Sequence, residues 1–163
     1  KMIPMFVESE MHYYRTYVKI LNRTDQEENL GYILHCKSCG HRKTSLEQQQ
    51  ECDLCKSKIS IAGPLWIGKI FDKEFVKNMI DEIPNLKINK SCEKTLHKCL
   101  DESEMAATYF TLDEIAKKVK SSPPKLEKII SNLKENGFTS STTSFNPTGF
   151  RTNATIDQII KIF

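Results

Sequence analysis

The sequence predicts an α+β fold, in which a small cysteine-rich β module comes before a mainly helical domain. Three observations carry this prediction. Residues 11–20 alternate as a β-strand does, two C-x2-C pairs follow with twelve residues between them, and helical periodicity dominates the last third. We therefore divide the 163 residues into a connecting strand and loop (1–30), a four-cysteine module (31–62), a segment with a helix and a linker (63–90) and a winged-helix-like domain (91–163).

The first two segments are expected to be rich in β-strands. From Met11 to Ile20, β-branched and aromatic residues dominate and every second side chain shares a face, which favours a strand. Residues 22–29 are polar and predict a loop. Residues 32–34 and 58–61 predict short strands that lead into and out of the cysteine pairs, so the cysteines should close a small β-rich unit.

The four cysteines have the spacing of a metal site, with Cys36 and Cys39 in one pair and Cys52 and Cys55 in the other. Two thiolates of one tight turn can bind the same ion, and two such turns supply the tetrahedron that zinc prefers. Four free thiols or two disulfides are the alternatives, but the polar residues around the pairs argue against an apolar core. Four thiolates leave no open position for water, so we predict a structural zinc.

Nothing in the sequence predicts catalysis by this chain, and we assign no catalytic residue. The four histidines lack a nucleophile or carboxylate arrangement around them. His35 and His41 flank the first cysteine pair and are alternative ligands, but the four cysteines already complete the tetrahedron. The six glycines form no strand-to-helix phosphate loop, which excludes a nucleotide or nucleoside cofactor fold within the chain.

A helix and a linker are predicted after the cysteine module. Residues 63–70 contain the only Trp, and Asp72 beyond them has the side chain of a helix N-cap. The helix that follows carries apolar residues at helical spacing and should end at Pro84. Residues 85–90 are polar and are predicted to be a linker.

The last third predicts the order helix, helix, turn, helix and hairpin, which is that of a winged helix. The first helix runs near residues 96–105, and the capping-box spacing of residues 111–114 opens the second. Prolines at 123–124 suit the first turn of the third helix, which Gly137 should end. A hairpin with its turn at 146–149 follows.

Winged helices commonly meet nucleic acid through their last helix and their hairpin. Candidate RNA contacts are the basic side chains around that helix and on the hairpin: Lys117, Lys118, Lys120, Lys125, Lys128 and Arg151. The first three also suit the last turn of a helix, where cations complement the dipole, and winged helices also dock proteins. The net charge of +3 falls to about +1 once four thiolates bind zinc, so the total charge does not decide whether the chain binds nucleic acid.

Composition gives further expectations about the compartment. No segment has the length of a membrane span or the layout of a signal peptide, so no membrane partner is predicted. Cys92 and Cys99 are seven residues apart on a predicted helix and are expected to be small core residues, which fits a reducing cytoplasm. Residue 1 is Lys rather than Met, so we expect the chain to begin inside a longer protein.

Several strings occur in order along the chain: HYYR (12–15), the two cysteine pairs, GPLWIG (63–68), DKEF (72–75), YFTLDEIA (109–116) and SFNPTGFRTNA (144–154). Together they resemble the C-terminal half of the tRNA (guanine-26-N2)-dimethyltransferase family, and most of all its archaeal members. The resemblance covers essentially the whole chain. The GPLW and NPTG strings are its most specific parts.

The resemblance implies an enzyme that uses S-adenosylmethionine to methylate the exocyclic amine of guanosine 26 in tRNA. In that family the methyl transfer and its cofactor belong to an N-terminal domain. The resemblance thus makes this chain a zinc-stabilised, tRNA-binding C-terminal domain whose partners are tRNA and its own catalytic domain. The hairpin has Thr142 and Ser144 where the family has Arg and His, so it offers two fewer RNA contacts. The alternative is a stand-alone zinc-ribbon and winged-helix protein that binds nucleic acid or serves as an adaptor.

Overall fold

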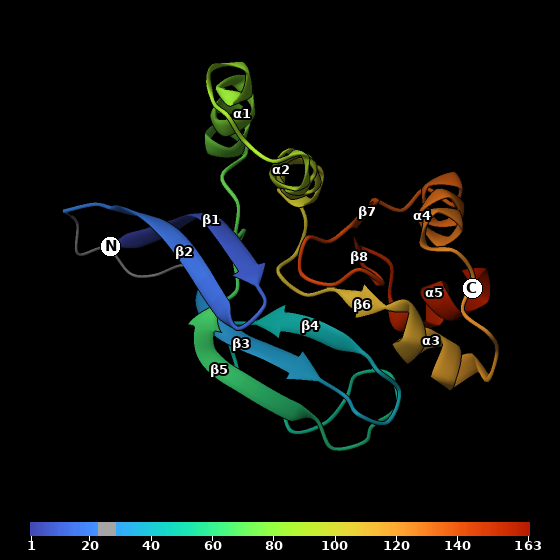
Figure 1. The fold of residues 1–163 in the computed structure, drawn as a ribbon. Coiled ribbons are helices and arrows are strands. Elements are labelled where there is room, and N and C mark those ends of the chain that lie inside the picture. The colour runs from blue at the N-terminus through green and yellow to red at the C-terminus, as the bar shows by residue number, and fades with distance from the viewer. Residues whose placement is uncertain (23–28) are drawn as a thin grey trace.

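The computed structural model describes residues 1–22 and 29–163, and most of the predicted polar loop at 22–29 lies outside them (Figure 1). This described part contains five α-helices, one 3-10 helix and three small antiparallel sheets, which confirms the mixed α+β class. None of its helices is both long and apolar enough to cross a membrane.

The first sheet is a hairpin of two strands, β1 (Met2–Glu10) and β2 (Tyr13–Ile20). Only β2 was predicted, because Pro4 and a β-bulge between Pro4 and Phe6 interrupt the alternation of β1. Phe6 is buried, and its ring lies 5.7 Å from that of Phe71 in the protein core. Every residue of β2 is exposed.

The second sheet holds the cysteine module and has the strand order β4-β3-β5. Its strands are β3 (Leu30–His35), β4 (Arg42–Ser45) and β5 (Ser60–Trp66). The sequence predicted β3 and the start of β5, but β5 continues through a cis Gly63–Pro64 bond to Trp66. It does so because Leu65 and Trp66 pair with the beginning of β3. Lys58 belongs to an isolated bridge with Glu51 instead.

Two helices follow, α1 (Lys73–Asp81) and α2 (Lys90–Glu102), with a 3-10 helix η1 (Ile83–Asn85) between them. The side chain of Asp72 accepts a hydrogen bond from the amide of Phe75 at 2.8 Å, as its N-cap position predicts. Cys99 is buried, but Cys92 is exposed, so the expectation of two core cysteines is wrong for Cys92. Cys92 lies in the first turn of α2, beside an open apolar pocket rather than within the core.

The C-terminal part combines three helices with a sheet of order β6-β8-β7. Its elements are β6 (Phe110–Thr111), α3 (Leu112–Val119), α4 (Leu126–Glu135), β7 (Ser140–Thr142), β8 (Gly149–Thr152) and α5 (Ile156–Ile162). Their apolar side chains form one core around Ile115, Leu133 and Phe150. α4 begins at Leu126, so residues 123–124 precede the helix instead of forming its first turn.

Gly137 ends α4 as predicted. The amide of Gly137 donates to the carbonyl of Lys134, and the amide of Phe138 donates to that of Leu133, each at 3.0 Å. This pair of bonds is a Schellman motif, which needs a left-handed residue after the helix. Gly137 supplies it with a φ of +83°.

Candidate metal centre and nucleic-acid interface

The two cysteine pairs lie in turns with the same backbone hydrogen bonds. In the first turn the amide of Cys36 donates to the carbonyl of His41, and the amide of Gly40 donates to that of Cys36, both at 2.8 Å. The second turn has the same two bonds. The amide of Cys52 donates the first at 2.9 Å, and the carbonyl of Cys52 accepts the second at 3.0 Å. The fifth residue of each turn is left-handed, with φ of +86° at Gly40 and +59° at Lys56. Each turn therefore aims its two thiols in the same way.

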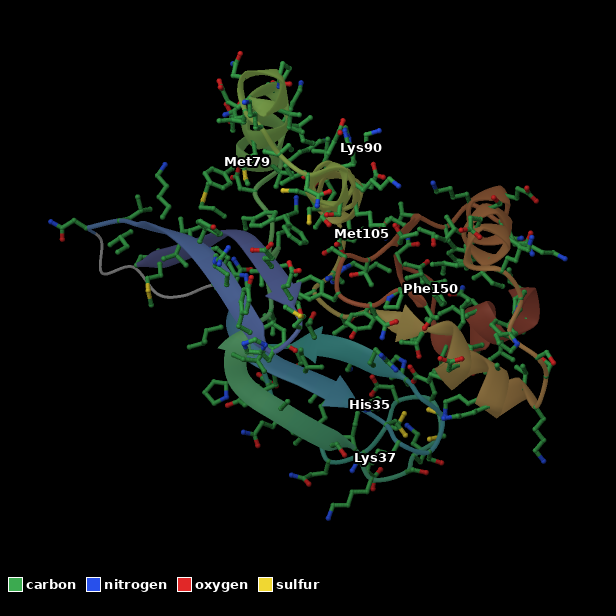
Figure 2. The ribbon with its side chains drawn as sticks, viewed as in Figure 1. His35, Lys37, Met79, Lys90, Met105 and Phe150 are labelled. Atoms are coloured by element: carbon green, nitrogen blue, oxygen red, sulfur yellow. The ribbon has the colours of Figure 1, made fainter. Side chains whose placement is uncertain are left out.

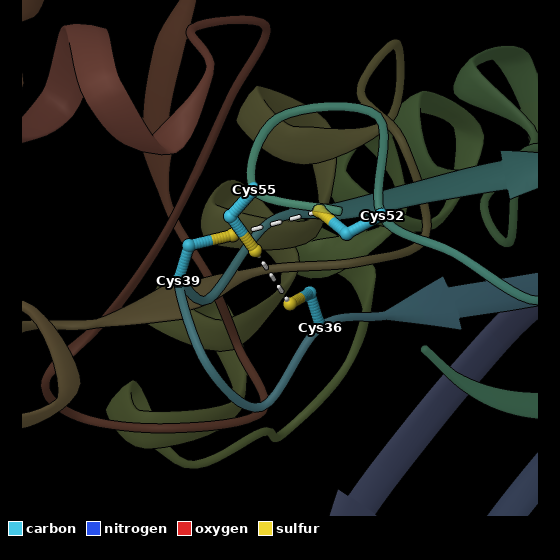
Figure 3. Close-up of side chains that lie close together, drawn as sticks. All are labelled: Cys36, Cys39, Cys52 and Cys55. Carbon is cyan, nitrogen blue, oxygen red and sulfur yellow. Dashed lines mark hydrogen bonds between the residues drawn. The ribbon is translucent and has the colours of Figure 1, made fainter. Parts of the chain in front are cut away.

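The four sulfur atoms form one cluster between the two turns (Figure 3), where all lie within 4.8 Å of one another. The Sγ atoms of Cys36 and Cys55 are 3.4 Å apart, and those of Cys39 and Cys52 are 3.6 Å apart. A disulfide would bring them to about 2.0 Å. Four sulfurs at about 2.3 Å from a zinc ion are roughly 3.8 Å from each other. The cluster therefore could hold a metal ion.

The four thiols differ in their surroundings. Cys36 and Cys52 are fully buried, whereas Cys55 is exposed. Without metal, burial raises the pKa of Cys39 to about 12, and hydrogen bonding to Ser57 lowers the pKa of Cys55 to about 6. Because metals bind the thiolate, protons must leave when an ion enters, and affinity for the ion rises with pH.

Arg42, on β4, fixes the cysteine module to the C-terminal part. Its guanidinium donates to the carboxylate of Glu114 on α3 and to the carbonyl of Tyr109, and it lies 4.4 Å from the ring centre of Phe110. Thr111 caps α3 by accepting from the amide of Glu114 at 3.3 Å. The Glu114 side chain pairs with Arg42 instead of completing the predicted capping box. No sequence pattern marks Arg42, because its partners lie about 70 residues away.

The predicted basic contacts lie on α3, on α4 and in the turn between them. Lys117, Lys120, Lys125 and Lys128 are exposed, and Lys117 and Lys120 line the same open hollow between α3 and the turn. Lys120 is the left-handed C-cap of α3, and Lys125 is the N-cap of α4. Lys118 is half-buried, and its ammonium donates to a carbonyl of the first cysteine turn at 3.2 Å.

Arg151 has a different place from the one expected of an RNA contact. It lies on β8 with 1% of its surface exposed, and its guanidinium pairs with the buried carboxylate of Glu102. It also donates to the carbonyl of Ala106. The expectation that Arg151 reaches RNA from the surface of the hairpin is therefore corrected. Phe150 points into the apolar core, so strand alternation places Arg151 on the opposite face of β8, where Glu102 at the end of α2 covers and neutralises it.

Comparisons with known proteins agree with this architecture. The family model for N2,N2-dimethylguanosine tRNA methyltransferases matches residues 1–163. The tRNA (guanine(26)-N(2))-dimethyltransferase of Methanosphaera stadtmanae is 34% identical over 95% of this chain and 42% of its own length. The tRNA (guanine(26)-N(2)/guanine(27)-N(2))-dimethyltransferase of Aquifex aeolicus is 32% identical over 98% of this chain and 42% of its own length.

A solved structure shows the same fold. Trm1 from Pyrococcus horikoshii in complex with S-adenosyl-L-methionine superposes with a TM-score of 0.77 and is 26% identical, over 99% of this chain and 43% of that one. The chain thus spans less than half the length of the curated relatives it matches. The resemblance expected from its sequence strings is confirmed: the chain belongs to the N2,N2-dimethylguanosine tRNA methyltransferase family.

Proposed function

We propose that this chain is the zinc-stabilised, tRNA-binding C-terminal part of an S-adenosylmethionine-dependent tRNA (guanine-26-N2)-dimethyltransferase. The family match over the whole chain carries this proposal. It is supported by relatives that methylate guanine 26 of tRNA and by the Pyrococcus horikoshii structure with S-adenosyl-L-methionine. The chain has no glycine loop for that cofactor, so its part in the reaction is to hold the RNA. The target base must leave its stack to be methylated, which requires a firmly held substrate.

The metal is zinc, and its role is structural. Four thiolates at near-tetrahedral spacing suit zinc better than the oxygen-preferring ions. The four cysteines complete the tetrahedron, so the site has no open position for water or substrate. Zinc in this place holds the two turns together, and through Arg42 it fixes the orientation of the module against α3.

The C-terminal part is winged-helix-like, and it presents the RNA-binding surface. Supporting this are the element order α2, β6, α3, α4, β7, β8 and the sheet order β6-β8-β7. In winged helices the helix in the position of α4 commonly faces nucleic acid. Lys125 and Lys128 lie at its start, where their ammonium groups are exposed and free to reach phosphates.

Replacing Lys125 and Lys128 with Gln should weaken tRNA binding and flatten its salt dependence. Each phosphate contact contributes about 0.9 to the slope of log affinity against log salt concentration, so two lost contacts remove nearly twice that. The measurement is tRNA affinity at four or more salt concentrations, with duplex DNA as a competitor. Lys77→Gln is the matched control, since this exposed lysine lies on α1, across α2 from α4 (Figure 1). An unaltered slope would point to a protein-docking surface.

The catalytic part of the enzyme is proposed to dock on the β1–β2 hairpin. β2 carries large apolar side chains that are exposed on both faces: Tyr13, Tyr14, Tyr17, Val18 and Ile20. Its outer edge has no strand partner among the described residues. Two-stranded sheets are marginal on their own, and an unpaired apolar edge is a template for another strand. The relatives contain more than half of their length beyond this chain, which supplies such a partner.

Replacing Tyr14 and Ile20 with Glu should leave the stability of this chain within about 0.5 kcal/mol, because both side chains are already solvated. The same change should weaken binding of the separately expressed catalytic part by at least roughly tenfold, since charge would enter an apolar interface. Titration calorimetry measures the binding. Leu46→Glu serves as the control, because Leu46 is 65% exposed but lies beyond β4. Equal binding by all three proteins would reject the hairpin as the docking surface.

A further inference from the structure

An open cleft of about 610 Å³ lies between the cysteine module and the C-terminal part. One wall is a face of the second sheet. Ile33 pairs with Ala62 and His35 pairs with Ser60, so these four side chains share that face. The segment from Ala107 to Thr111 and the start of α3 form the opposite wall. The other face of the sheet is occupied, since Leu34 packs there with the cysteines.

The walls combine apolar surface with a small number of hydrogen-bonding groups. Ile33, Ala62 and Ala107 are apolar and Tyr109 is aromatic, and the polar groups of the lining include His35, Arg42 and Thr111. This mixture is typical of a pocket for a small molecule. The Nε atom of Arg42 is buried and has no hydrogen-bond partner among the described residues.

His35 adds a donor and an acceptor. It lies on the sheet face that lines the cleft, and a neutral imidazole has one ring nitrogen that donates and one that accepts. Such a pair can read the hydrogen-bonding edge of a heterocycle.

Lysine side chains lie next to the cleft. A second hollow shares His35, Thr111 and Glu114 with it and is also lined by three lysines and one further carboxylate: Lys37, Lys117, Lys118 and Asp113. Figure 2 shows His35 at the end of β3, on the side of α3, and Lys37 just beyond the end of that strand. Lys37 and Lys117 are exposed, and the carboxylate of Glu114 is already paired with Arg42. An apolar cleft can bind the base of a nucleotide, and the lysines next to the cleft can bind its phosphate.

We propose that this cleft is a nucleobase subsite, which takes one unstacked nucleotide of the tRNA and holds its phosphate at Lys37 and Lys117. This inference rests on the proposed tRNA binding and adds that one base of the tRNA binds in the cleft. A paired helix presents its backbone and cannot place a base in the cleft, so the nucleotide belongs to a loop or a bulge. Single bases bind in this way through their apolar faces as well as their edges.

Methyl NMR of the whole chain, labelled at Ala and Ile, tests the subsite. An unmodified tRNA transcript should shift the methyl signals of Ala62, Ala107 and Ile33, and an RNA duplex of the same length should not. Shifts confined to α4, for example at Ile130, would overturn the subsite while tRNA binding stands. No shift at any methyl would contradict both proposals, so the two failures are distinguishable.

A cleft-filling variant gives a second test. Ala62 is exposed on β5, so Ala62→Phe should keep the fold while its ring occupies the cleft. The tRNA affinity should fall on the order of tenfold and its salt slope should become flatter, because the phosphate held at Lys37 and Lys117 is lost together with the base. Ala106→Phe is the control, since Ala106 is exposed and does not line the cleft. Equal affinity for Ala62→Phe and the parent chain would overturn the proposal.

Discussion

Cys52→Ser is expected to unfold the cysteine module. Cys52 is fully buried, and the apolar core around it is small, with Leu34 and Ile59 as its other buried side chains besides Cys36. So little apolar surface cannot hold the two turns together without a metal. Structural zinc contributes on the order of 10 kcal/mol to the folding of modules of this kind. The loss of Cys52 as a ligand should therefore remove most of the stability of the cysteine module.

The measurement is amide NMR of the module, combined with thermal unfolding with and without a chelator. The chelator should reproduce the effect of Cys52→Ser on the parent chain. Cys92→Ser is the control, because Cys92 is an exposed thiol on α2 that lies outside the cluster. It should change stability by less than about 0.5 kcal/mol. Unchanged melting of the parent chain in excess chelator would show that the metal does not stabilise the fold.

The second large effect is expected at the buried pair of Glu102 and Arg151. The Glu102 carboxylate also accepts from the hydroxyl of Thr143 at 2.7 Å and from the amide of Ser144 at 2.7 Å. It thus joins the end of α2 to the β7–β8 hairpin. Arg151→Met would leave a buried carboxylate without its cation, which costs about 3–5 kcal/mol. Urea unfolding followed by circular dichroism measures this loss.

Two further variants show whether burial causes the effect. Glu102→Leu combined with Arg151→Met removes both charges and should be less damaging than Arg151→Met alone. Glu104→Gln breaks the ion pair of Glu104 with Lys69, whose side chains are 54% and 56% exposed. It should cost less than about 1 kcal/mol, since exposed pairs contribute little. Similar losses for Glu104→Gln and Arg151→Met would contradict a special role for the buried pair.

Local patterns made the four-cysteine cluster predictable. Each pair of cysteines is fixed by its own turn, and only the approach of the two turns depends on the rest of the fold. Helix caps were predictable for the same reason, as Asp72 and Gly137 show. Such features depend on residues a few positions apart, so spacing alone reveals them.

Features that depend on distant partners could not be predicted from spacing. Arg151 was expected at the surface because a cation on a hairpin usually is, and only Glu102, 49 residues earlier, explains its burial. The extension of β5 to Trp66 depends on pairing with the start of β3. The cleft is likewise built from segments around residues 33, 62 and 109, which no sequence motif connects.

The bridge from Arg42 to Glu114 and Tyr109 gives the proposed zinc an influence beyond the two cysteine turns. A chain that loses the ion would lose one wall of the cleft and the carbonyl that holds Lys118. Because a ligand of the folded state shifts the population by mass action, the fraction of chains ready to receive RNA should follow the supply of zinc. The proposed zinc would then influence RNA binding through the fold of the chain, at a distance from the cleft.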